Sequence, residues 1–96
     1  LGSLSIDGDY VMVLTTNGKK YFLDESLDFW EKNLPESDFF RLNRQTIIHR
    51  QVLQGFRKLD HGKLEAQLDP KHKCDLELGI SRAKASAFRG WFLPNR

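Results

Sequence analysis

Residues 39–50 read Phe39-Phe40-Arg41-Leu42-Asn43-Arg44-Gln45-Thr46-Ile47-Ile48-His49-Arg50. The stretch begins with an aromatic pair and ends in a β-branched segment, and both are typical of strands with a buried face. The short polar segment between them carries Arg41 and Arg44. Because the apolar ends favour burial, we expect them to hold the polar middle in a fixed place at the surface.

The positive charge of the chain is concentrated in two blocks. Residues 39–58 contain five basic residues and no acidic one, and residues 80–96 contain four and none. The remaining segments are acidic, so the net charge of the chain is only +2. Local potential steers an anionic partner more than total charge does, so the two blocks favour a partner rich in phosphate. A solvated basic face without a partner would give the same pattern.

Length and composition predict one domain with a core. The chain has 96 residues, of which 40% are hydrophobic, and no apolar run reaches the roughly 18 residues of a membrane span. The single cysteine, Cys74, excludes an internal disulfide framework and is typical of the cytoplasm, where we expect the protein to be located. Residues 1–3 are set aside as a remnant of expression, which places the domain at residues 4–96.

A β-hairpin is predicted at residues 10–23. Residues 10–16 and 19–23 have strand character, and Asn17-Gly18 between them suits a two-residue type I′ turn. Such a turn sets the register of the two strands. The pairs expected are Leu14 with Tyr21, Val13 with Phe22, and Met12 with Leu23.

Two short helices are also predicted. Ser26 suits the N-cap of a helix that ends before Pro35, and its apolar stripe consists of Leu27, Trp30 and Leu34. Ser81 suits the N-cap of a second helix, over residues 82–92.

The remaining elements are strands. Residues 52–57 have strand character, and residues 63–68 and 73–80 alternate apolar and polar positions. Period-two alternation on both sides of a turn indicates an antiparallel sheet with one wet face. We expect turns at residues 60–62 and 69–72.

The sequence contains no pattern that predicts catalysis. It has no nucleophile motif and no glycine-rich phosphate loop. His49, His61 and His72 lie in a strand and two turns, and their spacing does not suggest a metal site. We therefore expect neither an enzyme nor a bound metal or cofactor.

Residues 39–49 resemble the signature segment of LytTR domains, the output modules of LytR/AgrA-type bacterial response regulators. In that family an aromatic pair and Arg are followed by an apolar residue, His, Arg or Asn, a small polar residue, an aromatic, two β-branched residues and Asn. Three other features match in the same order: the hairpin of residues 10–23, the helix after Ser26, and Ile80-Ser81-Arg82 before the last helix. The resemblance extends over about residues 9–92.

The chain departs from the family pattern at four positions of the segment. Asn43 replaces the usual His, Gln45 a small Ser, Thr46 an aromatic, and His49 the final Asn. The strand that usually precedes the hairpin is represented only by residues 4–6. These changes leave the predicted fold intact and suggest a different sequence preference.

The resemblance implies a mostly β fold, with elongated antiparallel β-sheets and two short helices, that inserts loops into successive major grooves of DNA. The family's contacting positions carry over to Arg44 and Arg82, with Asn43 and Lys84 as neighbours. Arg41 and Arg50 have supporting roles on phosphates or on acids of the chain itself. Asp9 occupies a third contacting position, but its carboxylate would repel phosphate and it is not included.

The function that this resemblance implies is sequence-specific DNA binding by the output domain of a two-component response regulator. Its partners would be double-stranded DNA, a second copy in a homodimer on repeated half-sites, and a receiver domain in the full-length protein. The alternative is a protein–protein interaction module of the same fold that docks an acidic partner.

Overall fold

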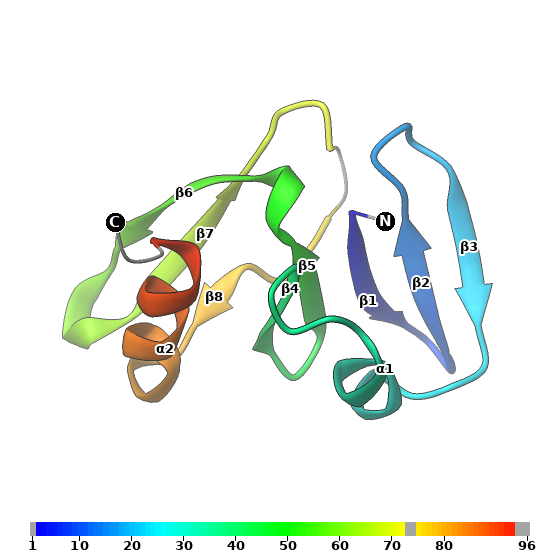
Figure 1. Cartoon of the computed structure of the whole chain (residues 1–96), viewed down its shortest axis with the longest axis horizontal. Coiled ribbons are helices and arrows are strands. Elements are labelled where there is room, and N and C mark those ends of the chain that lie inside the picture. The colour runs from blue at the N-terminus through cyan, green and yellow to red at the C-terminus, as the bar shows by residue number, and fades with distance from the viewer. Residues whose placement is uncertain (1, 73–74, 94–96) are drawn as a thin grey trace.

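The computed structural model of the chain describes residues 2–72 and 75–93, which form two antiparallel sheets and two α-helices (Figure 1). The first sheet has the strand order β3-β2-β1-β5-β4, and the second has the order β6-β7-β8. The principal extents of the chain are 33 × 26 × 25 Å. The prediction of a mostly β fold with two short helices is confirmed. The elements are β1 (Ser3–Asp7), β2 (Tyr10–Leu14), β3 (Lys20–Leu23), α1 (Leu27–Asn33), β4 (Phe39–Asn43), β5 (Thr46–His49), β6 (Leu53–Lys58), β7 (Leu64–Leu68), β8 (Gly79–Ile80) and α2 (Arg82–Phe92), with short 3-10 turns η1 (Arg50–Val52) and η2 (Asp60–Gly62).

Strands β4 and β5 lie between two separate hydrophobic cores. Successive side chains of a strand point to opposite faces, and Ile47 and Ile48 accordingly enter different cores, each about 1% exposed or less. Ile47 packs in a cluster with Leu4, Val11, Val13 and Leu27, where α1 covers the first sheet. Ile48 belongs to the larger core, which lies between the first sheet, the second sheet and α2, and its strand partner Phe40 packs against that core. The other buried residues of the larger core are Leu42, Val52, Leu64, Ala66, Ile80, Ala85 and Phe88.

Phe88 holds α2 against both sheets. Its side chain is fully buried and its ring contacts those of Phe40 and Phe56 edge to face, at centroid distances of 5.4 and 5.6 Å. Trp91 and Phe92 extend the same aromatic cluster along α2. Since these aromatic rings come from β4, β6 and α2, the cluster fixes where α2 begins relative to β4.

Both predicted helix starts are confirmed. The hydroxyl of Ser26 accepts a hydrogen bond from the N–H of Phe29 at 3.1 Å, and that of Ser81 from the N–H of Lys84 at 3.3 Å. Each bond satisfies one of the N–H groups that a helix start leaves unpaired.

The predicted hairpin exists, but its register is wrong by one residue. The observed pairs are Val11 with Leu23, Met12 with Phe22, Val13 with Tyr21 and Leu14 with Lys20. The N–H of Gly18 donates to the carbonyl of Thr15 at 3.1 Å, the N–H of Thr15 donates to that of Lys19 at 2.9 Å, and Gly18 has a φ of 88°. The loop is therefore a three-residue loop with a left-handed glycine at its end, rather than a two-residue type I′ turn.

The strand expected at residues 73–80 is much shorter in the structure. Lys73 and Cys74 lie outside the described residues, and only Gly79 and Ile80 form β8. Leu76 and Leu78 still pack against the larger core, as their alternation suggested. The alternation correctly predicted which side chains point toward the core, but it did not predict how few of these residues form strand hydrogen bonds.

Ser3, which the sequence prediction excluded from the domain, belongs to the first sheet, and Gly2 directly before it is hydrogen-bonded to that sheet. Both are buried, Ser3 begins β1, and the N–H of His49 donates to the carbonyl of Gly2 at 2.8 Å. The Ser3 hydroxyl also lies 2.8 Å from Nε2 of His72, a buried side chain in the turn after β7. The first strand therefore extends over Ser3–Asp7 instead of residues 4–6, and β1 is the central strand of its sheet.

The free energy of unfolding should fall when the pH is lowered below about 6.5. Burial lowers the pKa of His72 below its ordinary value of 6.5, and it does the same to His49. The unfolded chain therefore takes up these protons at higher pH than the folded chain. The stability that the neutral imidazoles contribute is present above about pH 6.5 and is lost as the pH falls through the lowered pKa values.

Urea denaturation at a series of pH values measures this loss. We expect His72→Gln to reduce the slope of unfolding free energy against pH between about pH 7 and pH 5. The matched control is His61→Asn, which removes an exposed histidine of η2. An unchanged slope in His72→Gln would contradict the assignment.

Candidate nucleic-acid interface

The turn between β4 and β5 presents Arg44 and Gln45, and both side chains are exposed. The strands on either side are anchored by Leu42 and Thr46, which are fully buried. Neither the side chain of Arg44 nor that of Arg82 has an ion pair or hydrogen bond within the described residues. Their guanidinium groups are thus available to an external anion.

Asn43 ties this turn to the segment before α2. Its amide nitrogen donates to the carbonyls of Glu77 and Gly79, at 2.9 and 2.8 Å, and its amide oxygen accepts from the N–H of Gln45 at 2.8 Å. All of the amide's hydrogen-bonding atoms are therefore used inside the protein. Asn43 positions the turn and is not oriented toward a base.

Arg41 clamps the same turn to α1. Its Nε donates to the carbonyl of Asn43 at 3.0 Å and its Nη2 to that of Arg44 at 2.9 Å, while Nη1 pairs with Asp28 and Glu31. The side chain is only 12% exposed. The hydrogen bond and positive charge of Arg41 hold the pKa of Asp28 below its usual value. Arg41 therefore offsets part of the negative charge of these two acids beside the turn.

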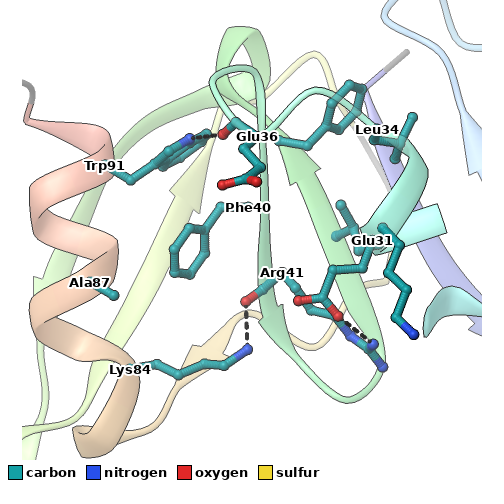
Figure 2. A pocket seen from close by; sticks show the side chains of 11 residues that line it. Glu31, Leu34, Glu36, Phe40, Arg41, Lys84, Ala87 and Trp91 are labelled. Carbon is teal, nitrogen blue, oxygen red and sulfur yellow. Dashed lines mark hydrogen bonds and ion pairs between the residues drawn. The ribbon is translucent and has the colours of Figure 1, made fainter. Parts of the chain in front are cut away.

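Lys84 and Arg50 are also used within the chain. Nζ of Lys84 donates to the main-chain carbonyl of Arg41 at 3.0 Å (Figure 2). Arg50 donates to the carbonyls of Ser37 and Trp91, and its guanidinium lies 4.1 Å from the centroid of the Trp91 ring. Lys84 and Arg41 both line a groove of about 820 Å³, together with residues of α1 and α2.

Arg82 lies exposed in the first turn of α2. The stem of its side chain covers Gly62, where an added Cβ would come within 3.0 Å of Cγ of Arg82. The first turn of α2 contains no acidic residue. A cation here is unfavourable in isolation, because the helix dipole already makes the N-terminus positive, and it becomes favourable when an anion binds.

The turn and the start of α2 lie next to each other. Arg44 and Ser81, the residue before Arg82, line one surface depression of about 390 Å³, together with Arg41, Asn43 and Lys84. The depression is therefore lined by four of the six predicted residues, Arg41, Asn43, Arg44 and Lys84. Arg82 directly follows the lining residue Ser81, and Arg50 lies apart beside Trp91. Of the six, only Arg44 and Arg82 have side chains without a partner within the described part of the chain.

Sequence reasoning missed the positioning partners of this region. Asp28 and Glu31 are three residues apart on one face of a helix, a spacing at which two carboxylates can hold one cation. That spacing is the signal that could have identified the clamp on Arg41. The carbonyls that accept from Asn43 lie more than 30 residues away along the chain and gave no local signal.

The described part of the chain shows neither a membrane-spanning helix nor a metal-binding cluster. No helix there is long and apolar enough to cross a bilayer. No group of three or more His, Cys, Asp or Glu side chains among these residues could hold a metal ion.

Two antiparallel sheets with a basic turn beside a helix start define a small β domain that presents arginines at one end. Residues 2–93 match the family model described as the LytTr DNA-binding domain. Since this match covers nearly the whole chain, the protein belongs to the LytTr DNA-binding domain family, and the resemblance drawn from the sequence is confirmed. The family is one of DNA-binding domains and not of enzymes.

A solved structure shares the fold. It is described as the LytTr DNA-binding domain of a proposed methyl-accepting/DNA response regulator from Bacillus cereus, with a TM-score of 0.78 and 20% sequence identity. The similarity covers 99% of this chain and 82% of that one. No curated protein is significantly similar in sequence.

Replacing Asn43 by Ala should loosen the turn that carries Arg44. The carbonyls of Glu77 and Gly79 would lose their donor, which we expect to cost about 1–3 kcal/mol of unfolding free energy. Urea denaturation measures the loss, and hydrogen exchange at Gln45 reports the local loosening. Gln45→Ala is the control, because it truncates an exposed side chain of the same turn. Equal stability of the two variants would contradict the positioning role.

Proposed function

We propose that this chain is the sequence-specific DNA-binding output domain of a bacterial two-component response regulator, with Arg44 and Arg82 as its main contacts to double-stranded DNA. The observation that carries the proposal is that the six candidate residues fall into two groups, those with hydrogen-bond partners inside the protein and those without. Asn43, Lys84, Arg41 and Arg50 are used inside the protein, and Arg44 and Arg82 remain exposed and unpaired within the described residues.

Arginine at the tip of a β-turn suits the major groove. A guanidinium can donate two parallel hydrogen bonds to guanine or neutralise a phosphate. The turn of β4 and β5 is held by Arg41 on one side and Asn43 on the other. A turn that is fixed before binding loses less conformational freedom when it enters the groove.

The ion pairs of Arg41 with Asp28 and Glu31 also favour the binding of a negatively charged partner. Asp28 and Glu31 would repel a phosphate backbone near Arg44, and their pairing with Arg41 reduces that repulsion. Arg41 and Lys84 thus support the interface without touching DNA. Arg50 acts further away, by fixing the end of α2.

The wider assembly follows from the same proposal. The similar domain from Bacillus cereus is described as part of a response regulator. By analogy, a receiver domain in the full-length protein would control the occupancy of repeated half-sites by two copies of this domain.

Arg44→Ala and Arg82→Ala should each weaken binding to a selected DNA site. We expect each variant to lose about 1–3 kcal/mol if the arginine reads a base, or to flatten the slope of log affinity against log salt by about one unit if it contacts a phosphate. Fluorescence anisotropy at several salt concentrations, on a site selected from a random duplex library, measures both quantities.

The control variant is Lys71→Ala. Lys71 is an exposed cation in the turn after β7 and lines a depression with Thr16 of the β2–β3 loop. That loop lies on the opposite side of the molecule from the β4–β5 turn (Figure 1). The affinity and salt slope of this variant should equal those of the unmodified chain. Full affinity and an unchanged slope in both arginine variants would disprove the proposal. Failure of unrelated duplex DNA to compete, with binding of an acidic protein instead, would favour the interaction module.

A further inference from the structure

Strand β3 is an exposed edge strand with opposite charges at its two ends. It is the outermost strand of the first sheet, and no described strand pairs with its outer side (Figure 1). Lys20, Tyr21 and Phe22 are exposed. Lys19 precedes the strand, and the exposed acids Asp24 and Glu25 follow it. An unpaired edge of this kind can accept another strand.

The main-chain groups that face outward can be identified from the β2–β3 register. The N–H of Thr15 donates to the carbonyl of Lys19, which makes this a hydrogen-bonded pair. Hydrogen-bonded and non-bonded pairs alternate along an antiparallel ladder, so the next bonded pair is Val13 with Tyr21. The N–H and C=O groups of Lys20 and Phe22 therefore point away from β2 and are free to pair with a further strand.

A second copy of the same strand fits this edge in one register. In a two-fold antiparallel pair, residues whose main-chain groups point outward must lie opposite one another. The two-fold axis can then pass through Tyr21, Phe22 or Leu23, and each choice of this central residue defines one register. The centre at Phe22 places Lys20 opposite Asp24, the first residue after β3, and brings Lys19 and Glu25 together just beyond the strand ends. The centre at Tyr21 places Lys20 opposite Phe22, and the centre at Leu23 places Tyr21 opposite Glu25. Only the middle register pairs every charge with its opposite.

Exposed aromatic side chains support the same register. The rings of Tyr10 and Phe22 lie edge to face with centroids 6.4 Å apart, and the two residues are 52% and 57% exposed. With the two-fold axis at Phe22, each Phe22 lies beside its symmetry mate. The two Tyr10–Phe22 pairs then form one row of four rings across the sheet, which removes apolar surface from water.

We propose that β3 pairs with β3 of a second copy of this chain, in the register centred on Phe22, to form a two-fold dimer with one continuous sheet. Lysine on an edge strand normally discourages such pairing. Here the acids at the other end of the strand compensate it, and they do so for this chain itself rather than for an arbitrary strand. Self-complementarity of this kind is what an isologous interface requires.

This dimer leaves the proposed DNA-binding region free. Strand β4, with the turn that carries Arg44, is at the opposite edge of the sheet from β3. Antiparallel pairing directs the two β4–β5 turns to opposite ends of the joined sheet. The dimer therefore differs from a pair of domains that lie side by side on adjacent half-sites, and it does not depend on DNA binding.

Sedimentation equilibrium of the DNA-free chain, up to millimolar protein, tests the pairing. The mass should rise toward that of a dimer with concentration. Lys20→Glu and Asp24→Lys should each weaken association by about tenfold or more, because each variant places like charges opposite one another twice in the dimer. The double variant Lys20→Glu/Asp24→Lys should restore it. Lys58→Glu is the control, since it makes the same change of charge at an exposed position of β6, in the other sheet.

Any of three results would overturn the proposal: a monomer at every concentration, single variants that associate like the unmodified chain, or a double variant that is not restored. All of these residues are exposed, so the variants should fold. Their DNA affinity at concentrations where the chain is monomeric serves as the check, and this readout also separates failure of the dimer from failure of the proposed DNA contacts.

Disulfide trapping determines the register. Hydrogen-bonded antiparallel partners have Cα atoms about 5.5 Å apart, which is within the range of a disulfide. In a Cys74→Ser background, Phe22→Cys should form a covalent dimer on mild oxidation, and Tyr21→Cys should form far less. Equal trapping at the two positions, or preferential trapping of Tyr21→Cys, would overturn the register centred on Phe22.

Discussion

The structure depends on the placement of one β-hairpin, β4 and β5, between two hydrophobic cores. Ile47 and Ile48 are neighbours in sequence, yet one packs beneath α1 and the other beneath α2. A slip of one residue would exchange the faces of the strand and bury the wrong side chains in both cores. The register is therefore strongly fixed, and with it the position of the turn. The exposure of Arg44 follows from the burial of its neighbours in the hairpin.

The cations around this hairpin are divided between internal and external roles by geometry. Arg41 can reach two carbonyls and two carboxylates at once because a guanidinium has five donors in a fixed plane, whereas Lys84 offers a single ammonium to one carbonyl of β4. Removing either would leave at least one part-buried main-chain carbonyl unpaired. The charge available to a phosphate backbone is for this reason smaller than the count of basic residues in the sequence.

The features that the sequence predicted well are local. Helix caps depend on a hydroxyl and an N–H three residues apart, and both Ser26 and Ser81 were identified correctly. The predicted hairpin register was wrong by one residue, because Asn17-Gly18 suits both a two-residue loop and a three-residue loop with Gly18 in the left-handed region. The exposure of Arg44 and Arg82 was also predicted. The internal roles of Asn43 and Lys84 were not, because their acceptors come from other elements of the fold. Pairing of Arg41 with acids of the chain was one of two expected roles, but its partners Asp28 and Glu31 were not identified.

The two edges of the first sheet differ in whether their outward-pointing main-chain groups have hydrogen-bond partners. On the β4 edge, the carbonyl of Arg41 accepts from Lys84, and Asn43 donates to the segment leading to α2, so that edge is covered by its own chain. On the β3 edge, the outward groups of Lys20 and Phe22 face solvent. An edge strand that is neither covered nor protected by a net charge of one sign remains competent to pair. Covering one edge with the structure that presents Arg44 thus leaves the other as the edge at which the sheet can be extended.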